Sequence, residues 1–196
     1  MGARHPTDLP VIHFESDRLW ERWLKTNHAS SAGLWLKIAK SNSGIDTVTY
    51  AQALETALCY GWIDGQKAAF DSRFWLQRFT PRKSGSAWSK VNRGKATRLM
   101  DEGRMKPAGM RQIERARQSE EWEKAYESQG TSSVPDDLKQ KLEEDPAALK
   151  FFESLDSANR YAILYRIHQA RKPETRARRI EKYLGMLREK KKLYSV

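Results

Sequence analysis

The sequence predicts an α+β fold, with a small N-terminal sheet packed with helices and an all-helical C-terminal region. Residues 73–80 alternate between two faces, as the residues of a β-strand do. The polar stretch 129–135, which contains both Gly and Pro, is typical of a linker, and helical spacing continues beyond it. We therefore expect an α+β domain at residues 1–130 and a helical domain at residues 135–196.

Apolar spacing and turn residues place the N-terminal elements in the order β-α-β-α-β-β. Ser16 or Asp17 stands where a helix cap belongs, immediately before an apolar stripe. Thr49 caps the next helix, and Gly61 ends it because glycine readily adopts the left-handed conformation found there. The expected elements are a strand at 11–14, a helix after Ser16 or Asp17, a strand at 34–39, a helix from Thr49 to Gly61, and strands at 62–70 and 73–80.

From Ser86 onward the sequence has the period of helices. Ser86 is expected to cap the first of them, and Pro173 stands at the start of the last. The expected helices run over 86–102, 107–118 and 120–127, over short segments broken at Asp145–Pro146, after Asp156–Ser157, and from Pro173. The residues that keep the helical period in the last helix are Ile180, Tyr183, Leu184 and Leu187.

The composition excludes several classes of protein. Of the 196 residues, 39% are hydrophobic and 31% charged, which is the balance of a globular chain. Cys59 is the only cysteine, so the chain forms no internal disulfide and no cysteine-based zinc site. The four histidines are not at helical ligand spacing, and we expect neither a metal site nor a cofactor. No apolar stretch is as long as a membrane span, which predicts a cytoplasmic protein.

The net charge of +11 is unevenly distributed along the chain. Residues 65–117 hold 14 basic and 4 acidic side chains, and residues 160–196 hold 12 and 3. Residues 118–159 hold 4 basic and 11 acidic side chains. The basic segments would attract phosphates and anionic surfaces. The alternative is that the acidic segment lies against one basic segment and neutralises it within the fold.

The stretch around Ser86 has the residue types of an anion-binding pocket. First-turn amides of a helix have no helical partner and favour an anion, and two arginines come shortly before this point. Two tryptophans offer rings for stacking, and one carboxylate would orient a donor group of a ligand. The alternative is that Ser86 only caps, the tryptophans fill the core, and the arginines are solvated or paired with the acidic segment. The candidate ligand-binding residues are Trp62, Asp64, Arg78, Arg82, Ser86, Trp88, Ser89 and Asn92.

Two other functions are consistent with the sequence. The last helix carries four basic side chains largely outside its apolar period, which would run along a nucleic acid backbone, or would form a solvated outer face. These side chains are Arg176, Arg178, Arg179 and Lys182. The other function is a small enzyme centred on Asp64, although a lone carboxylate at a turn more often caps an amide than acts as a base. No catalytic residue is assigned.

Three segments carry a family resemblance: Gly61–Gly65 (GWIDG), Arg78–Asn92 and Ala170–Ile180. In this order they resemble the YdeI/OmpD-associated, or bacteriocin-protection, family from about Phe14 to Leu187. The resemblance implies an α+β N-terminal part and a helical C-terminal part, and it assigns no catalytic residues. With the predicted pocket, the expected function is a cytosolic, non-enzymatic binding or stress-tolerance protein. Its partner would be an anionic small molecule or an acidic protein surface.

Overall fold

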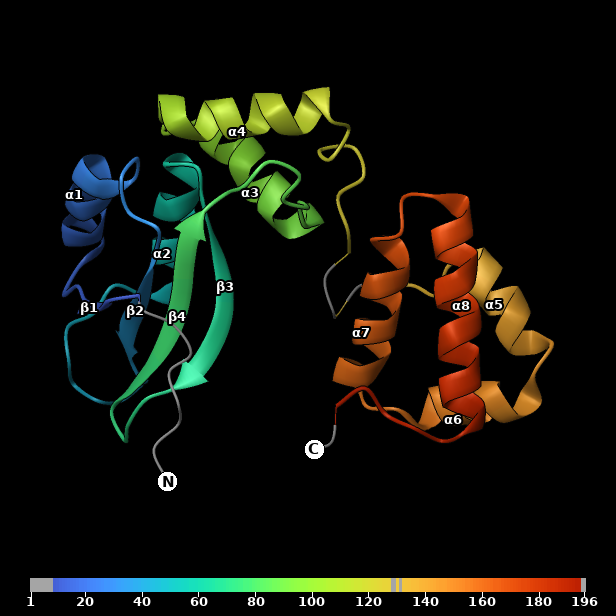
Figure 1. Ribbon diagram of the computed structural model, residues 1–196. Coiled ribbons are helices and arrows are strands. Elements are labelled where there is room, and N and C mark those ends of the chain that lie inside the picture. The colour runs from blue at the N-terminus through green and yellow to red at the C-terminus, as the bar shows by residue number, and fades with distance from the viewer. Residues whose placement is uncertain (1–8, 128–129, 131, 195–196) are drawn as a thin grey trace. The chain divides into compact units, whose positions relative to one another are not determined.

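A four-stranded sheet forms the centre of the N-terminal part of the protein (Figure 1). The computed structural model describes residues 9–127, 130 and 132–194. The elements are β1 (Val11–His13), α1 (Asp17–Asn27), β2 (Leu34–Ala39), α2 (Tyr50–Cys59), β3 (Trp62–Ala69) and β4 (Phe74–Pro81). The spatial order is β1-β2-β4-β3, in which β1 and β2 are parallel and the other neighbours antiparallel. The predicted β-α-β-α-β-β order is confirmed.

Local signals set the starts of α1 and α2 and the end of α2 where the sequence predicts them. Ser16 Oγ accepts a hydrogen bond from Leu19 N at 3.4 Å at the start of α1. Thr49 and Gln52 form a reciprocal capping box at the start of α2, which satisfies backbone amides that have no helical partner. Gly61 follows α2 with a left-handed φ of +76°. Each of these signals depends on a few neighbouring residues, so the sequence alone predicts it.

Aromatic side chains fill the space between the sheet and the two helices that cover one of its faces. Trp20 of α1 is fully buried and donates its Nε1 hydrogen to Ala53 O at 3.1 Å. Its ring centroid lies 5.7 Å from that of Phe79 in β4 and 6.3 Å from that of Trp62 in β3. Buried aromatic rings supply much of the apolar area of a small core, so this cluster anchors α1 to the sheet.

Two further helices follow the sheet, α3 (Lys90–Asp101) and α4 (Pro107–Gln118). The predicted bounds of α4 are confirmed, but the prediction that α3 begins at Ser86 is wrong. Residues 83–86 form a turn instead, because Ser86 Oγ accepts a hydrogen bond from Lys83 N at 3.0 Å and Gly85 has a φ of +74°. Ser86 therefore closes a turn rather than capping a helix.

The predicted helix over 120–127 is also wrong, because residues 119–124 form turns. Glu120 has a φ of +60°, a left-handed conformation that interrupts a helix. Trp122 N then donates to Ala116 O at 3.1 Å, so that the chain folds back on the end of α4. The ring of Trp122 lies edge-on against that of Trp88, with 4.8 Å between their centroids.

Helix α4 is held against the end of α2 by close backbone contacts. Lys106 N donates to Cys59 O at 3.2 Å. A Cβ placed on Gly109 would lie 2.4 Å from Cys59 O, and one placed on Gly61 would lie 2.8 Å from Ala108 O. Neither position has room for a larger residue, so the two glycines let α4 approach closely and fix its position on the N-terminal part.

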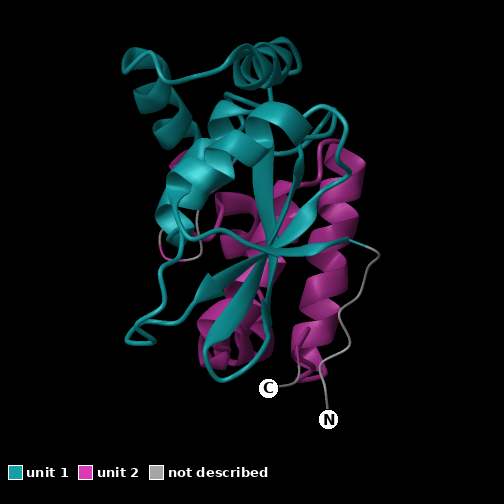
Figure 2. Ribbon diagram, turned by 90° about the vertical axis from the view of Figure 1, so that its left-hand side faces the viewer, with its two compact units in different colours: residues 1–88, 92–124 teal, residues 89–91, 125–196 magenta. Residues whose placement is uncertain are grey.

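The chain divides into two compact units, which are coloured separately in Figure 2. We call residues 1–88 and 92–124 the N-terminal unit and residues 89–91 and 125–196 the helical unit. The predicted linker 129–135 includes residues 129 and 131, which lie outside the described residues. The domain limits expected from composition therefore stay a prediction.

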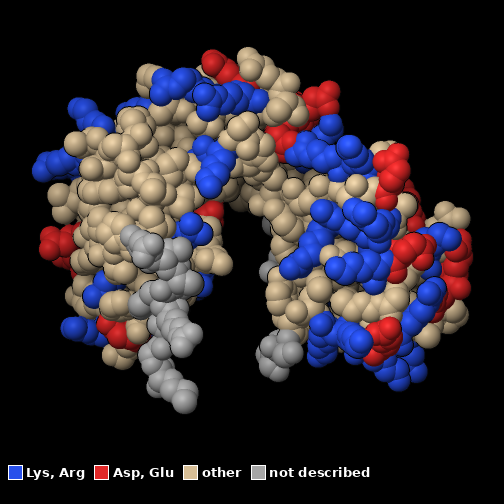
Figure 3. Space-filling view, in the orientation of Figure 1, with Lys and Arg blue, Asp and Glu red and all other residues tan. Residues whose placement is uncertain are grey.

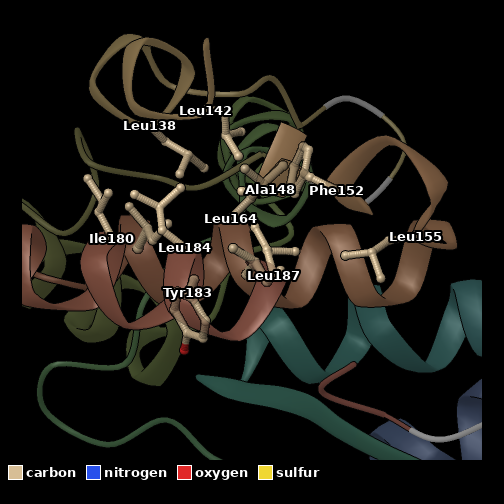
Figure 4. Packing of buried hydrophobic residues seen from close by; sticks show 12 residues of the cluster. Leu138, Leu142, Ala148, Phe152, Leu155, Leu164, Ile180, Tyr183, Leu184 and Leu187 are labelled. Carbon is tan, nitrogen blue, oxygen red and sulfur yellow. The ribbon is translucent and has the colours of Figure 1, made fainter. Parts of the chain in front are cut away.

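Four helices form the core of the helical unit (Figure 4). They are α5 (Asp136–Glu143), α6 (Pro146–Ser154), α7 (Ser157–His168) and α8 (Pro173–Arg188). Every regular element described after Pro135 is a helix, which confirms the all-helical C-terminal region. Asp145 and Asp156 cap α6 and α7. The residues predicted to face inward from α8, namely Ile180, Tyr183, Leu184 and Leu187, are all buried in this core.

Acidic side chains of the segment 118–159 pair with basic side chains of the C-terminal segment. Asp137 accepts two hydrogen bonds from Arg176, at 2.5 Å and 2.8 Å, and Asp145 pairs with Arg188. Figure 3 shows basic and acidic side chains interspersed over the helical unit. For these two pairs, the acidic segment neutralises basic charge within the fold, as the alternative interpretation of the charge pattern expects.

Because of Asp137 and Asp145, we expect acid to destabilise the helical unit. The hydrogen bond from Arg176 lowers the pKa of Asp137. The hydrogen bond from the backbone amide of Ala148 lowers the pKa of Asp145 most, and the hydrogen bond from Arg188 lowers it further. A lowered folded-state pKa stabilises the fold above the unfolded value, about 3.9 for Asp, and this contribution is lost as the pH falls through the folded value. The melting temperature of the helical unit, measured by circular dichroism, should therefore fall below about pH 4.

The matched control for this prediction is Asp145→Asn. Asparagine keeps the capping oxygen but carries no titratable charge. The variant should be less stable than the natural protein near neutral pH, and the two melting temperatures should converge as the pH falls. Parallel pH profiles for the two proteins would contradict the role assigned to the Asp145 carboxylate.

Candidate functional site

A cavity of about 520 Å³ opens in the N-terminal unit between the loop after β4 and the C-terminal half of α4. We call it the loop–α4 cavity. Its volume lies in the range of small-molecule sites. The side chains that matter for its chemistry are Arg82, Lys83, Ser86, Trp88, Arg115 and Glu121.

Arg82 and Trp88 form a fixed wall of this cavity. The guanidinium carbon of Arg82 lies 3.5 Å from the ring centroid of Trp88, an arrangement that is favourable for a cation over an aromatic ring. Arg82 Nη1 also donates to Ala87 O at 3.4 Å. Both side chains are buried, with 5% of Arg82 and 3% of Trp88 exposed. The guanidinium is therefore held in one place, and the notion of a solvated arginine at this position is wrong.

The remaining charged side chains of the cavity differ in exposure. Lys83 and Arg115 are exposed, whereas Glu121 is buried. The cavity thus combines three cations with one carboxylate. Ser86 contributes a hydroxyl group whose oxygen accepts from Lys83 N. Such a site favours an anionic group, because guanidinium groups bind carboxylate and phosphate through paired hydrogen bonds.

The structure brings Arg82, Ser86 and Trp88 together at this cavity, but it places Trp62 elsewhere. Trp62 is fully buried and donates its Nε1 hydrogen to His28 O at 3.1 Å. The expectation that its ring stacks on a ligand is wrong, and the core interpretation holds for it.

Asp64 and Arg78 do not line the loop–α4 cavity. Asp64 accepts a hydrogen bond from Tyr50 Oη at 2.8 Å. It pairs across the sheet with Phe79 and therefore lies on the same face as Phe79. Arg78 precedes Phe79 in β4, and consecutive strand residues point to opposite faces, so Asp64 and Arg78 lie on opposite faces of the sheet. Asp64 lies in β3, as the strand predicted at 62–70 expects, and not at a turn.

Ser89 and Asn92 are both buried and lie outside the cavity lining. Ser89 forms a short parallel bridge with Tyr126 in the helical unit, and Asn92 lies in the first turn of α3. Their place in the sequence next to Trp88 suggested a shared site. Because α3 starts at Lys90 and not at Ser86, Ser89 and Asn92 do not reach the loop–α4 cavity.

Sequence reasoning missed the α4 wall of the cavity. Gln112, Arg115, Ala116 and Ser119 follow the helical pattern i, i+3, i+4, i+7 and so share one face of α4 and its C-cap. That spacing is visible in the sequence, and it could have indicated a common face. It does not indicate that the face covers the loop after β4, which results from the docking of α4 on α2.

The titratable groups near the end of α2 are suited to structural roles. Burial raises the pKa of the Cys59 thiol to about 11, so the thiol stays protonated and inert. Burial and then the neighbouring Glu21 raise the pKa of Tyr60 to about 12. Within the described part of the chain, no group of three His, Cys, Asp or Glu side chains is arranged to hold a metal. In the same residues, no helix has the length and apolar character needed to cross a bilayer.

The four basic residues proposed for nucleic acid binding have different environments in α8. Arg176 pairs with Asp137 and also donates to Ile167 O at 3.2 Å. Arg179 donates to Arg166 O. Both therefore help to hold α8 in the helical unit, while Arg178 and Lys182 are exposed. The four side chains do not form one free basic surface.

The fold defines a two-unit α+β protein, and comparison with known families addresses each part. Residues 12–112, half of the chain, match the family described as a domain of unknown function (DUF8412), and the chain belongs to this family. Residues 131–190 match the family described as Bacteriocin-protection, YdeI or OmpD-Associated, so the C-terminal part is a domain of this kind. No curated protein and no solved structure matches the chain.

The resemblance seen in the sequence is thus confirmed over the C-terminal part. The motif at 170–180 lies within that match. The motifs at 61–65 and 78–92 lie within the match to the other family. The family matches assign no site residues.

Proposed function

We propose that the protein is a non-enzymatic, cytoplasmic binding protein whose loop–α4 cavity holds a small molecule with a carboxylate or phosphate group. One observation carries the proposal: the Arg82 guanidinium is fixed on Trp88, at the wall of a cavity open to a ligand. A group that is fixed before binding loses little side-chain entropy when the ligand arrives. A guanidinium also recognises the planar geometry of a carboxylate.

The other charged residues of the cavity refine the ligand class. Arg115 approaches from α4, so an anion in the cavity can be contacted from two elements of the fold. Glu121 lowers the net positive charge of the lining. The combination supports a small ligand that carries an acidic group.

Arg115→Ala tests this proposal. The variant should bind L-glutamate or inorganic phosphate about tenfold more weakly or worse, because a hydrogen bond to a charged group contributes about 1.5–3 kcal/mol. Its melting temperature should change little, since the side chain is exposed. Isothermal titration calorimetry measures the affinity and calorimetric melting measures the stability. Arg115 is preferred to Arg82 because truncating the buried Arg82 would also remove packing on Trp88.

Arg117→Ala is the matched control. Arg117 is another exposed arginine of α4, and it does not line the cavity. The control has the same net charge as Arg115→Ala, so it should retain the affinity of the natural protein to within about twofold, as expected for surface charges. Equal losses in both variants would show that general charge, and not the cavity, attracts the ligand.

A further inference from the structure

A second cavity, of about 600 Å³, lies between α1 and the start of α4 in the N-terminal unit. We call it the α1–α4 cavity. It shares no lining residue with the loop–α4 cavity, and the function proposed above does not involve it. Its basic lining residues are Arg18, Arg22 and Lys25 of α1, together with Lys106 and Arg111.

The three basic residues of α1 lie on one face of that helix. Their spacing, four and then three residues, brings them one above another, while Trp20 and Leu24 lie on the buried face. Like charges at this spacing repel each other and destabilise a helix. Glu21 lies on the same face and offsets part of this repulsion, and an anion between the three cations would relieve the rest.

The opposite wall of the cavity is fixed in position. Lys106 and Arg111 flank the first turn of α4, which is docked on α2 through Lys106 N and Gly109. The basic groups therefore converge from two elements whose packing holds them near one another. Figure 3 shows lysine and arginine side chains gathered over α4.

The acidic group available inside this cavity is already engaged. Glu21, the acidic lining residue, accepts a hydrogen bond from Tyr60 Oη at 3.4 Å and lies 3.5 Å from Lys106 Nζ. The other four cations form no ion pair with any residue that the structure describes. They are Arg18, Arg22, Lys25 and Arg111.

Some basic side chains elsewhere in the same unit do have carboxylate partners. Glu55 alone pairs with three of them, at distances of 3.7 Å from Lys95 and 3.4 Å from Arg104, and also with Arg98. A carboxylate is thus within reach of some cations of this unit. Four cations without one, around a single concave site, mark the α1–α4 cavity as a place of unbalanced positive charge.

We propose that the α1–α4 cavity binds a compact polyanion that carries at least two phosphate or carboxylate groups. Several cations converge on it, so one singly charged ion would leave most of them unmatched. A bidentate guanidinium suits both types of acidic group. The volume of the cavity matches a small molecule.

The test uses the full chain with pyrophosphate and, separately, citrate as probes. We expect binding of at least one probe by isothermal titration calorimetry at low ionic strength, weakening as salt is added. The double variant Arg22→Ala/Arg111→Ala should bind that probe about tenfold more weakly or worse. Tighter binding of pyrophosphate would identify the ligand as a phosphate compound, and tighter binding of citrate as a polycarboxylate.

Two controls separate this proposal from the function proposed for the other cavity. Arg117→Ala removes a cation of α4 outside both cavities, and Arg115→Ala removes one inside the loop–α4 cavity. Both should retain the polyanion affinity to within about twofold. The double variant should still melt cooperatively, because Arg22 and Arg111 are exposed.

Three results would overturn the proposal. One is the absence of binding by either probe at millimolar concentration. Another is an equal loss of affinity in the double variant and in Arg117→Ala. The third is binding of duplex DNA that neither probe displaces, which would assign the basic face to a nucleic acid instead.

Discussion

Gly109→Ala should destabilise the N-terminal unit by about 3 kcal/mol, near the upper end of the usual cost of overpacking. The added Cβ would lie 2.4 Å from Cys59 O, 2.8 Å from Leu58 O and 2.5 Å from Met105 Sδ. The methionine side chain can move away, but the two backbone oxygens belong to the end of α2 and move only if α4 shifts as a whole. The free energy of unfolding from urea titration measures the loss.

The shift of α4 should also weaken both cavities, because α4 supplies a wall to each of them. Gly94→Ala is the matched control in the same unit. Gly94 is exposed in α3, and its added Cβ would meet no atom within 4 Å. Alanine there should stabilise the protein by up to about 1 kcal/mol through helix propensity. A Gly109→Ala protein as stable as the natural one would show that α4 is not held by this contact.

Asn159→Asp should destabilise the helical unit by about 3–5 kcal/mol, the cost of a buried charge without a partner. Asn159 is fully buried. Its Nδ2 group donates to Asp156 Oδ2 at 2.8 Å and to Tyr194 O at 3.2 Å, and its Oδ1 accepts from the amides of Leu193 and Tyr194 at 2.9 Å. In the variant, a carboxylate oxygen would face the Asp156 carboxylate at the position of the amide.

The loss should be smaller in acid, because the new carboxyl group, once protonated, can again donate a hydrogen bond. Repulsion from Asp156 would raise the folded-state pKa of this carboxyl group. The destabilisation is then absent below the unfolded value, about 3.9, and grows as the pH rises above it. Thermal melting at several pH values measures this, and the amide resonances of Leu193 and Tyr194 report whether the C-terminal segment detaches.

Gln140→Glu is the control for the charge change. It converts an exposed amide of α5 into a carboxylate, and we expect an effect within about 0.5 kcal/mol. Similar losses in the two variants would mean that added negative charge, rather than the buried network at Asn159, destabilises the unit.

Most helix ends could be predicted because their signals are local. Thr49 caps α2, Gly61 follows it in the left-handed conformation, and Asp145 caps α6 as its place before Pro146 suggests. The two wrong helix predictions, a helix start at Ser86 and a helix over 120–127, have local structural causes. Ser86 closes a turn with Lys83 instead of capping α3, and Glu120 adopts a left-handed conformation that ends the helical path.

The site was predicted in part for the same reason. Arg82 and Trp88 lie six residues apart, so a single loop brings them together. Trp62 and Arg78 come from strands, and the pairing of these strands carries them away from that loop. Arg115 joins the cavity only because α4 docks on α2 through contacts of Gly61 and Gly109, and a helical period does not reveal where a helix docks.

The sequence by itself determined the order of strands and helices, the all-helical C-terminal part, its family resemblance, and the excess of basic charge. These depend on residues within a few positions of each other and on composition. Tertiary structure decided which cations are neutralised and which converge on a cavity. Arg176 and Arg22 look alike in the sequence, yet Asp137 pairs with the first, while no described carboxylate pairs with the second. The energy of an ion pair depends on distance in space, and the docking of helices sets that distance.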